Sequence, residues 1–189
     1  MPYSNLIKAN SELFEKMKFI SVNDNIYINP IFPESIEAES RFYHQISNRA
    51  DIKKYIPNAY AETQDQAKER IFGNMKTMLL KGSLFYCIRF RKNKIPMGYI
   101  NFSTPIAPTG LKTWSVNYWL SEDFIGHGIM TVSLARMLDY LQLNQVPEVK
   151  ALVHSANVKS INVLNRIGFD FLHQEQGGER RFLYSLQLQ

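Results

Sequence analysis

The sequence predicts one α/β domain built on a mixed, largely antiparallel β-sheet of about six to seven strands. Its 189 residues and its net charge of +5 suit a single compact domain rather than two. Apolar residues make up 45% of the chain and charged residues 21%, so a large core can form and disorder is not expected. Short extended runs alternate with helical patterns along the whole chain, which is the third observation behind this fold class.

The N-terminal region is predicted to lead into a first strand and a helix. Residues 1–24 are expected to form an N-terminal extension that contains an amphipathic helix at 5–18. Apolar and polar residues alternate over 25–31, as they do in a half-buried strand. Pro33 stands where the first turn of a helix accepts proline, and a helix is expected to follow to about Ser47.

A capping pattern opens the next predicted helix. Thr63 is followed three positions later by Gln66, which resembles a capping box, and the helix is expected to end near Gly82. Extended runs follow at 83–91, 95–103 and 112–120. A charged turn at 92–94 separates the first two runs, so antiparallel hairpins are predicted.

The hydrophobic pattern changes period after a turn that contains Gly126 and Gly128. The next apolar residues share one helical face: Met130, Leu134, Met137, Leu138 and Leu141. Glycines let backbone approach a ligand closely, and the N-terminus of a helix presents unpaired N–H groups, so the turn could hold a pyrophosphate. A tight turn without a ligand is the alternative. The turn fits neither a Walker loop nor a dinucleotide fingerprint.

Three more extended runs and a short helix complete the chain. The runs lie at 149–154, 169–174 and 181–188, and the helix begins near Asn157 and is stopped by Gly168. Gly177 and Gly178 lie between the last two runs, which are therefore expected to form a hairpin.

Composition excludes several classes of function. The longest apolar runs are far shorter than the ~20 residues that cross a bilayer, and no signal-peptide pattern is present, so a cytoplasmic protein without membrane contact is expected. The single cysteine, Cys87, excludes an internal disulfide and is interpreted as buried filler. Metal-ligand spacing is missing from the four histidines, so no metal site is predicted: His44, His127, His154 and His173.

The densest basic cluster is interpreted as a solvated hairpin turn. It contains Arg89, Arg91, Lys92 and Lys94. Single-stranded nucleic acid is usually bound by basic residues interleaved with a series of aromatic platforms, and this cluster contains no such series, Phe90 being its one aromatic residue. Nucleic-acid binding is therefore not expected.

Three stretches of the second half occur in a characteristic order. They are Val116-Asn117-Tyr118-Trp119-Leu120, then Phe124-Ile125-Gly126-His127-Gly128-Ile129-Met130-Thr131, then Asn157-x-x-Ser160-x-x-Val163-x-x-x-x-Gly168-Phe169. In order and spacing they resemble the GNAT superfamily of acetyltransferases, in its RimJ/RimL-type branch. The resemblance is sharp across about residues 95–175 and extends upstream, where 27–31 looks like the opening strand. It implies a single acetyltransferase-like domain over 1–189, with a twisted sheet and helices on both faces.

The resemblance implies that acetyl-coenzyme A is the co-substrate. Its pyrophosphate would lie on the backbone amides of 125–131, and its pantetheine arm along the strand that ends at Leu120. The cofactor-binding residues implied in this way are Trp119, Leu120, Phe124, Ile125, Gly126, His127, Gly128, Ile129, Met130, Thr131, Asn157 and Ser160. One departure is Asp123, where the family usually has Gln or Arg. A carboxylate there would repel a pyrophosphate unless it points away and caps the helix start.

Two residues near the last helix are the candidates for handling the leaving group. Leu164 stands where many GNAT enzymes carry a tyrosine acid, so that acid is missing. The resemblance implies instead that Ser160 lies near the sulfur and donates or relays a proton, and that Asn157 holds the pantetheine or orients Ser160. From the residues alone, Ser160 could equally satisfy its own backbone at the helix start, and Asn157 could be only an N-cap.

For the catalytic base the resemblance points to Glu179, which lies ten residues beyond Phe169. The alternative is an exposed glutamate in a surface salt bridge at a hairpin tip; Glu175 and His154 are the reserve candidates, and a water-relayed base would also serve. In this family the acceptor channel is built from regions that correspond to about 34–60 and 174–181. Candidate lining residues there are Arg41, Tyr43, His44, Tyr55 and Tyr60.

The favoured function is N-acetyl transfer to a primary amine acceptor, with a protein or peptide N-terminus preferred over a small amine. A second hypothesis is an acyl-coenzyme A-binding sensor or assembly module that has lost turnover, which the missing tyrosine and Asp123 support. Nucleic-acid binding unrelated to coenzyme A ranks last, and both a monomer and a homodimer stay open.

Overall fold

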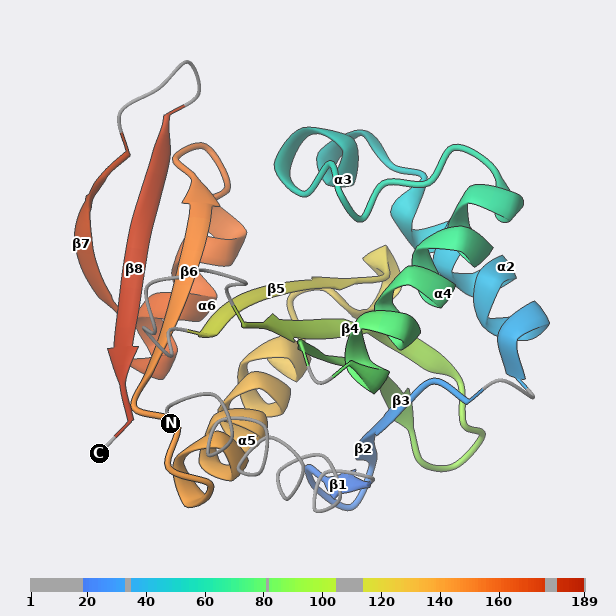
Figure 1. Ribbon diagram of the computed structural model, residues 1–189, viewed down its shortest axis with the longest axis horizontal. Coiled ribbons are helices and arrows are strands. Elements are labelled where there is room, and N and C mark those ends of the chain that lie inside the picture. Colours follow the sequence, from blue (N-terminus) through green and yellow to red (C-terminus); the bar gives the residue numbers. More distant parts are fainter. Residues whose placement is uncertain (1–18, 33–34, 81, 105–113, 176–179, 189) are drawn as a thin grey trace.

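The computed structural model describes residues 19–32, 35–80, 82–104, 114–175 and 180–188 (Figure 1). The helices are α2 (Ile36–Ser47), α3 (Ala50–Tyr55), α4 (Gln64–Leu79), α5 (Ile129–Leu143) and α6 (Val158–Ile167), with one 3₁₀ turn, η2 (Glu122–Phe124). The strands are β1 (Ile20–Ser21), β2 (Ile26–Pro30), β3 (Ser83–Phe90), β4 (Pro96–Ser103), β5 (Trp114–Leu120), β6 (Glu148–His154), β7 (Asp170–Gln174) and β8 (Arg181–Gln187). The helix predicted at 5–18 and the glycines at 177–178 lie outside the described residues.

The described strands form one sheet in the order β1-β2-β3-β4-β5-β6-β8-β7. All neighbouring pairs are antiparallel except β5 and β6, which confirms a mixed, largely antiparallel sheet. Eight strands exceed the predicted number because β1 has only two residues. A strand that short shows no period-two pattern in the sequence.

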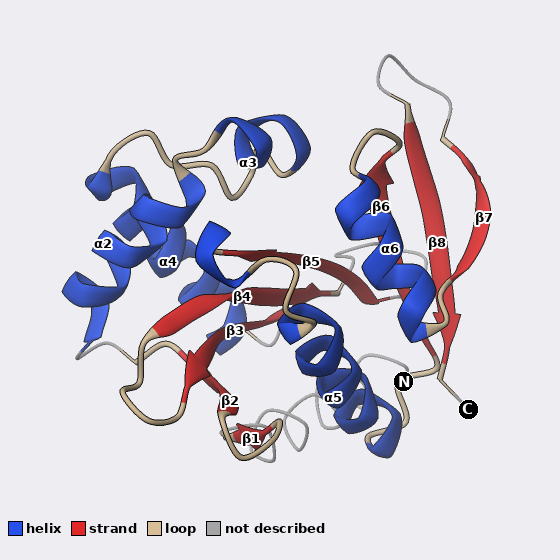
Figure 2. Cartoon of the chain, turned by 180° about the vertical axis from the view of Figure 1, so that it is seen from behind, coloured by secondary structure: helices blue, strands red, loops and turns tan. Residues whose placement is uncertain are grey.

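Helices cover both faces of the sheet, as expected (Figure 2). Leu84, Tyr86 and Ile88 of β3 belong to one buried cluster with the apolar residues of α5 and α6. Phe85 and Cys87, which point the other way, belong to a second cluster with residues of α2 and α4. Because successive side chains of a strand face opposite sides, β3 is buried on both faces and contributes to both clusters.

Two helices begin and pack as their local sequence predicts. The Thr63 side chain accepts a hydrogen bond from the Gln66 N–H at 3.2 Å, and the Gln66 side chain accepts one from the Glu62 N–H at 2.8 Å. The predicted apolar face of α5 is buried throughout: Met130, Leu134, Met137, Leu138 and Leu141. No described helix has both the length and the apolar character needed to cross a membrane.

The interpretation of the basic cluster as wholly solvated is wrong for Arg89. Its side chain is buried and forms an ion pair with Glu39 of α2, and its Nε donates to Asn29 Oδ1 at 2.8 Å. The hydroxyl of Tyr99 also donates to Glu39, at 3.3 Å. This buried group joins α2 to strands β2, β3 and β4. Cys87 is fully buried beside it, as predicted, and burial raises the pKa of its thiol.

The sequence patterns did not predict α3. It has six residues, too few to show a helical period, and it follows α2 after a break at Asn48 and Arg49. Figure 1 places α3 above the end of β5, across a gap from β6. Asp51, Ile52 and Tyr55 of this small helix line the cavity described next.

Candidate active site

The site is a cleft that forms where β5 and β6 diverge. The two strands pair only at Trp114 with Val149 and at Ser115 with Lys150. Beyond these pairs β6 turns away with β8 and β7, so no strand of the described residues pairs with β5 from Val116 onward on that side (Figure 1). A cavity of about 320 Å³ opens there, lined by residues of α3, β5, the 124–128 loop, α5 and α6.

The loop before α5 exposes backbone to this cavity. Gly126 and Gly128 both have left-handed backbone, with φ of 90° and 72°. A Cβ on either residue would meet no atom within 4 Å, so glycine is needed there for its conformation and not for lack of space. Gly128 is the N-cap of α5, no side chain caps the helix, and its first turn carries no acidic residue. The first N–H groups of α5 are therefore available to an anion.

Asp123 does not cap the start of α5. It lies in η2, its side chain is exposed, and α5 receives no side-chain cap. Asp123 is also not among the residues that line the cavity. The Asp123 carboxylate is therefore solvent-exposed and does not contact the cavity, so water screens its repulsion of a bound phosphate group.

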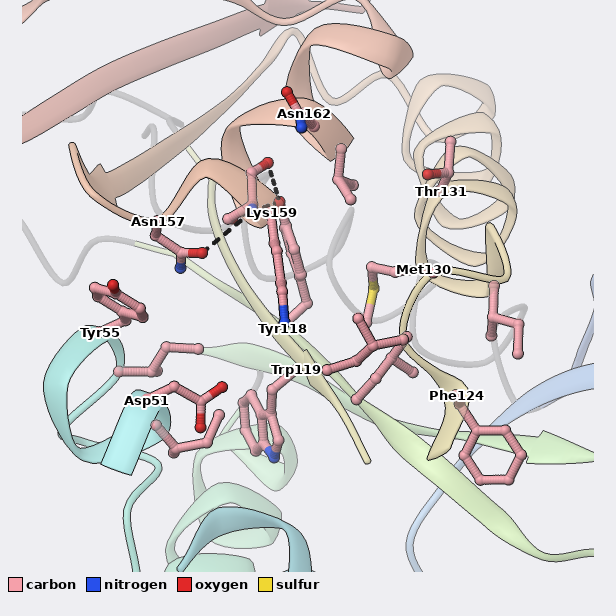
Figure 3. A pocket seen from close by; sticks show the side chains of 18 of the residues that line it. Asp51, Tyr55, Tyr118, Trp119, Phe124, Met130, Thr131, Asn157, Lys159 and Asn162 are labelled. Carbon is pink, nitrogen blue, oxygen red and sulfur yellow. Dashed lines mark hydrogen bonds between the residues drawn. The ribbon is translucent and has the colours of Figure 1, made fainter. Parts of the chain in front are cut away.

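Asn157 lies at the start of α6 on the wall of the cleft (Figure 3). Ser160, in the first turn of α6, also lines the cavity. Asn157 is the N-cap, because its side chain accepts a hydrogen bond from the Ser160 N–H at 3.2 Å. The Ser160 hydroxyl does not bond to its own backbone. Its Oγ lies 2.8 Å from the hydroxyl of Tyr118 on β5, and either hydroxyl could be the donor of that bond. The Tyr118 hydroxyl also lies 3.2 Å from the Ser160 carbonyl oxygen, a second possible acceptor of its proton. Burial raises the pKa of Tyr118 to about 12, so the phenol keeps its proton at neutral pH.

An arginine joins α3 to the end of β5. Arg49 donates to the Leu120 carbonyl at 2.8 Å and pairs with the Asp51 carboxylate through Nε at 3.0 Å. Its Nε also lies 3.3 Å from a carboxylate oxygen of Glu122. The side chain of Arg49 is only 14% exposed, so it is a built part of the cleft wall rather than a mobile surface cation. These contacts position α3 over the cavity.

Tyr55 closes the cleft on the side of α6. Its hydroxyl donates to the Ala156 carbonyl at 3.4 Å, and its ring packs against His154 with 5.3 Å between the ring centroids. Among the candidate acceptor-channel residues, only Tyr55 lines the cavity. Tyr43 is fully buried against Phe85, Tyr99 and Trp119 instead. Arg41, His44 and Tyr60 also lie away from the cavity lining.

Most of the other predicted site residues line the cavity. Every residue implied for cofactor binding lines the cavity except His127, whose side chain is exposed. Glu179 lies outside the described residues. Glu175 hydrogen-bonds to His173 at 3.1 Å and does not line the cavity, and His154 lines a small adjoining cavity of about 30 Å³.

Sequence reasoning missed several lining residues. Tyr118 is one of them, although it lies within the Val116–Leu120 motif. The period of two along a strand places Tyr118 with Val116 and Leu120 on the face toward α5 and α6, so its position beside the cavity could have been inferred. Lys159, Asn162, Val163 and Arg166 line the cavity with spacings of three, one and three along α6. This helical spacing is visible in the sequence and could have identified one wall. Arg49 and Asp51 had no local signal.

Comparisons with known proteins agree with this geometry. The family model described as the acetyltransferase (GNAT) domain matches residues 33–170. No curated protein matches the chain. Similar solved structures include an acetyltransferase from Salmonella typhimurium that modifies the N-terminal serine of ribosomal protein L7/L12, with 20% identity, TM-score 0.75, and coverage of 90% of this chain and 99% of that one.

Two further solved structures contain coenzyme A or acetyl-CoA. RimL, described as a ribosomal L7/L12 α-N-protein acetyltransferase in complex with coenzyme A, has 20% identity and a TM-score of 0.76, with coverage of 90% and 98% of the two chains. The microcin C7 self-immunity acetyltransferase MccE, in complex with acetyl-CoA and AMP, has 23% identity and a TM-score of 0.72, with coverage of 88% and 94%. At these identities the likeness shows a common fold.

Proposed function

Because the chain belongs to the GNAT family of acetyltransferases, we propose that its cleft transfers an acetyl group from acetyl-CoA to the α-amine of a protein or peptide N-terminus. The described elements would act together as one acetyltransferase domain in the cytoplasm. Acetyl transfer to an amine follows from the family. The choice of an N-terminal amine is supported by the acceptors named for the similar structures.

One observation carries the proposal. A single cavity brings together three kinds of group that acetyl-CoA requires: the uncapped N-terminus of α5, the unpaired edge of β5 beyond Ser115, and the hydroxyl of Ser160. The first suits a pyrophosphate, the second can hydrogen-bond the amides of a pantetheine arm, and the third can donate to a sulfur. The residues present therefore fit the co-substrate.

We assign Ser160 to the leaving group. As the C–S bond breaks, negative charge develops on the sulfur, and a hydroxyl that donates a hydrogen bond there lowers the barrier. Asn157 supports this role indirectly, because its bond to the Ser160 N–H holds the first turn of α6 in place. Direct transfer to an amine needs no acyl-enzyme, so the buried Cys87 has no part in it.

Glu179 is our candidate for the base that removes a proton from the acceptor amine. The structure argues against His154 as an alternative. Its Nδ1 accepts a hydrogen bond from the Ala156 N–H at 3.0 Å, so in the neutral ring the proton is on Nε2. The ring nitrogen that could accept a proton is therefore already occupied.

Binding of the co-substrate is tested first by thermal unfolding with acetyl-CoA. At a hundred times its dissociation constant a ligand of the native state adds ~2.7 kcal/mol. For a chain of this size the unfolding midpoint should rise by about 5–10 °C. Coenzyme A should reproduce the shift and ATP should not. No shift at millimolar acetyl-CoA would contradict the proposed function.

Turnover is tested by thiol release with a panel of short peptides that differ in their first residue. Glu179→Gln should lower kcat by about 10²-fold or more, as expected for loss of a general base, and should leave the acetyl-CoA thermal shift unchanged. Glu175→Gln is the matched control, because Glu175 does not line the cavity. Binding without thiol release from any peptide or small amine would instead identify a binding module.

A further inference from the structure

The Ser160 hydroxyl is hydrogen-bonded to the phenol of Tyr118, and this bond can control the direction in which the Ser160 hydroxyl proton points. Tyr118 comes from β5 and Ser160 from α6, and their hydroxyl oxygens lie 2.8 Å apart. Both residues line the cavity, and both are half-buried. The contact links the two walls that separate where β5 and β6 diverge.

The protons of this pair can be arranged in two ways. In one, Tyr118 donates to the Ser160 carbonyl, which only accepts, and the serine donates to the tyrosine oxygen. In the other, Tyr118 donates to Ser160 Oγ, and the serine proton is free to point into the cleft. Only the second arrangement lets Ser160 donate to a ligand. A hydroxyl that accepts a hydrogen bond is also a stronger donor, because neighbouring bonds polarise one another.

We propose that Tyr118 is a positioning residue for acetyl transfer: its phenol donates to Ser160 Oγ and thereby directs the Ser160 proton toward the departing sulfur. This inference rests on the proposed function. It offers a substitute for the tyrosine acid that is missing at Leu164, which is buried in the core. The phenol arrives from the strand instead of the helix and acts through the serine. The phenol is protonated at neutral pH, so its oxygen can donate, and burial raises its pKa further.

The step balances without a proton leaving Tyr118. The acceptor nitrogen forms a bond to the acetyl carbon, and its extra proton passes to the base, proposed as Glu179. The C–S bond breaks and its electron pair stays on the sulfur, which leaves as a thiolate hydrogen-bonded to Ser160. Water then protonates the thiolate. Tyr118 and Ser160 return unchanged, so the pair lowers the barrier by orientation alone.

The test is a double-mutant cycle on thiol release at saturating acetyl-CoA and peptide. Tyr118→Phe keeps the ring and its packing and removes only the phenol oxygen. We expect kcat to fall at least about tenfold, with KM for acetyl-CoA changed less than about threefold, because the bond acts in the transition state. Ser160→Ala should cost a similar factor alone and less than about twofold more in the Tyr118→Phe background, since the two act as a unit. Tyr140→Phe, a phenol on α5 away from the cavity lining, is the control.

The possible results separate the inference from the proposed function. Tyr118→Phe at the wild-type kcat, or Ser160→Ala with an equal cost in both backgrounds, would overturn the positioning role and leave the transferase assignment intact. A wild-type protein that binds acetyl-CoA but never releases thiol would contradict both. The positioning role also requires that acetyl-CoA raise the unfolding midpoint of the wild type and of Tyr118→Phe by the same amount. If Tyr118 were needed only to maintain the structure of the cleft, its replacement would weaken acetyl-CoA binding as well.

Discussion

Replacing Gly98 with alanine should displace the end of β5 that lines the cleft. Gly98 lies on β4 directly opposite Leu120. A Cβ there would be 2.3 Å from the Trp119 carbonyl oxygen and 2.9 Å from Leu120 Cα, whereas real Cβ contacts are almost never below 3.0 Å. The obstructing atoms belong to the backbone and cannot rotate away. The strand must therefore move by about 0.7 Å, the difference between 3.0 and 2.3 Å.

This displacement has a cost in both stability and binding. Overpacking of this kind typically costs ~1–3 kcal/mol, and for a chain of this size each kcal/mol lowers the unfolding midpoint by ~2–4 °C. Trp119 and Leu120 both line the cavity, so their displacement should weaken coenzyme A binding, by about tenfold for every ~1.4 kcal/mol of binding free energy. We expect both effects in Gly98→Ala.

The control is Gly73→Ala in the middle of α4. A Cβ at Gly73 meets no atom within 4 Å, and alanine should stabilise the helix by about 0.5–1 kcal/mol. Urea unfolding measures the stability of both variants, and tryptophan fluorescence reports coenzyme A binding, because Trp119 lines the cavity. Gly98→Ala with the wild-type midpoint and the wild-type dissociation constant would refute the reasoning from close approach.

Three further predictions concern single contacts. The pKa of Tyr118 is raised from 10 to about 12, so above pH 10 the unfolded chain loses this proton before the folded chain does, and the free energy of unfolding falls with rising pH by up to ~1.4 kcal/mol per pH unit. Urea unfolding between pH 9 and 11.5 should show a smaller fall for Tyr118→Phe than for the wild type. The same pH dependence in both proteins would contradict the raised pKa. Arg49→Ala should remove the hydrogen bond to the Leu120 carbonyl and the ion pair with Asp51, and should lower the free energy of unfolding in urea by ~1–3 kcal/mol. A decrease below ~0.5 kcal/mol would mean that the hydrogen bond does not stabilise the fold. Gly128→Ala places an alanine in left-handed backbone and should lower the free energy of unfolding in urea by ~1–2 kcal/mol. The same variant should bind coenzyme A more weakly in calorimetry. An unchanged stability and an unchanged dissociation constant would exclude a conformational role for this glycine.

Much of the fold could be predicted because local patterns determine it. The apolar face of α5 follows from residues spaced three and four apart, and the start of α4 follows from Thr63 and Gln66 three positions apart. Where the signal was weaker the prediction failed, as for the six-residue α3 and the two-residue β1. The prediction that Arg89 is solvated was wrong for another reason. The other members of its cluster, Arg91, Lys92 and Lys94, are exposed, whereas Arg89 is buried by a partner, Glu39, that is on a different element.

The sequence by itself determined the parts of the site that depend on neighbours along the chain. Gly126 and Gly128 indicated a turn that opens a helix, and Asn157 indicated an N-cap three residues before Ser160, because these features rest on backbone conformation and on hydrogen bonds within one turn.

Only the tertiary structure decided which groups face each other across the cleft. Tyr118 meets Ser160 from 42 residues away, and Arg49 meets the Leu120 carbonyl from 71 residues away. Periodicity predicts which face of an element is buried, but not which atom of a distant element will lie opposite. That choice depends on the angle at which β6 leaves β5 after two paired residues, which is set by the packing of the whole sheet between its helices.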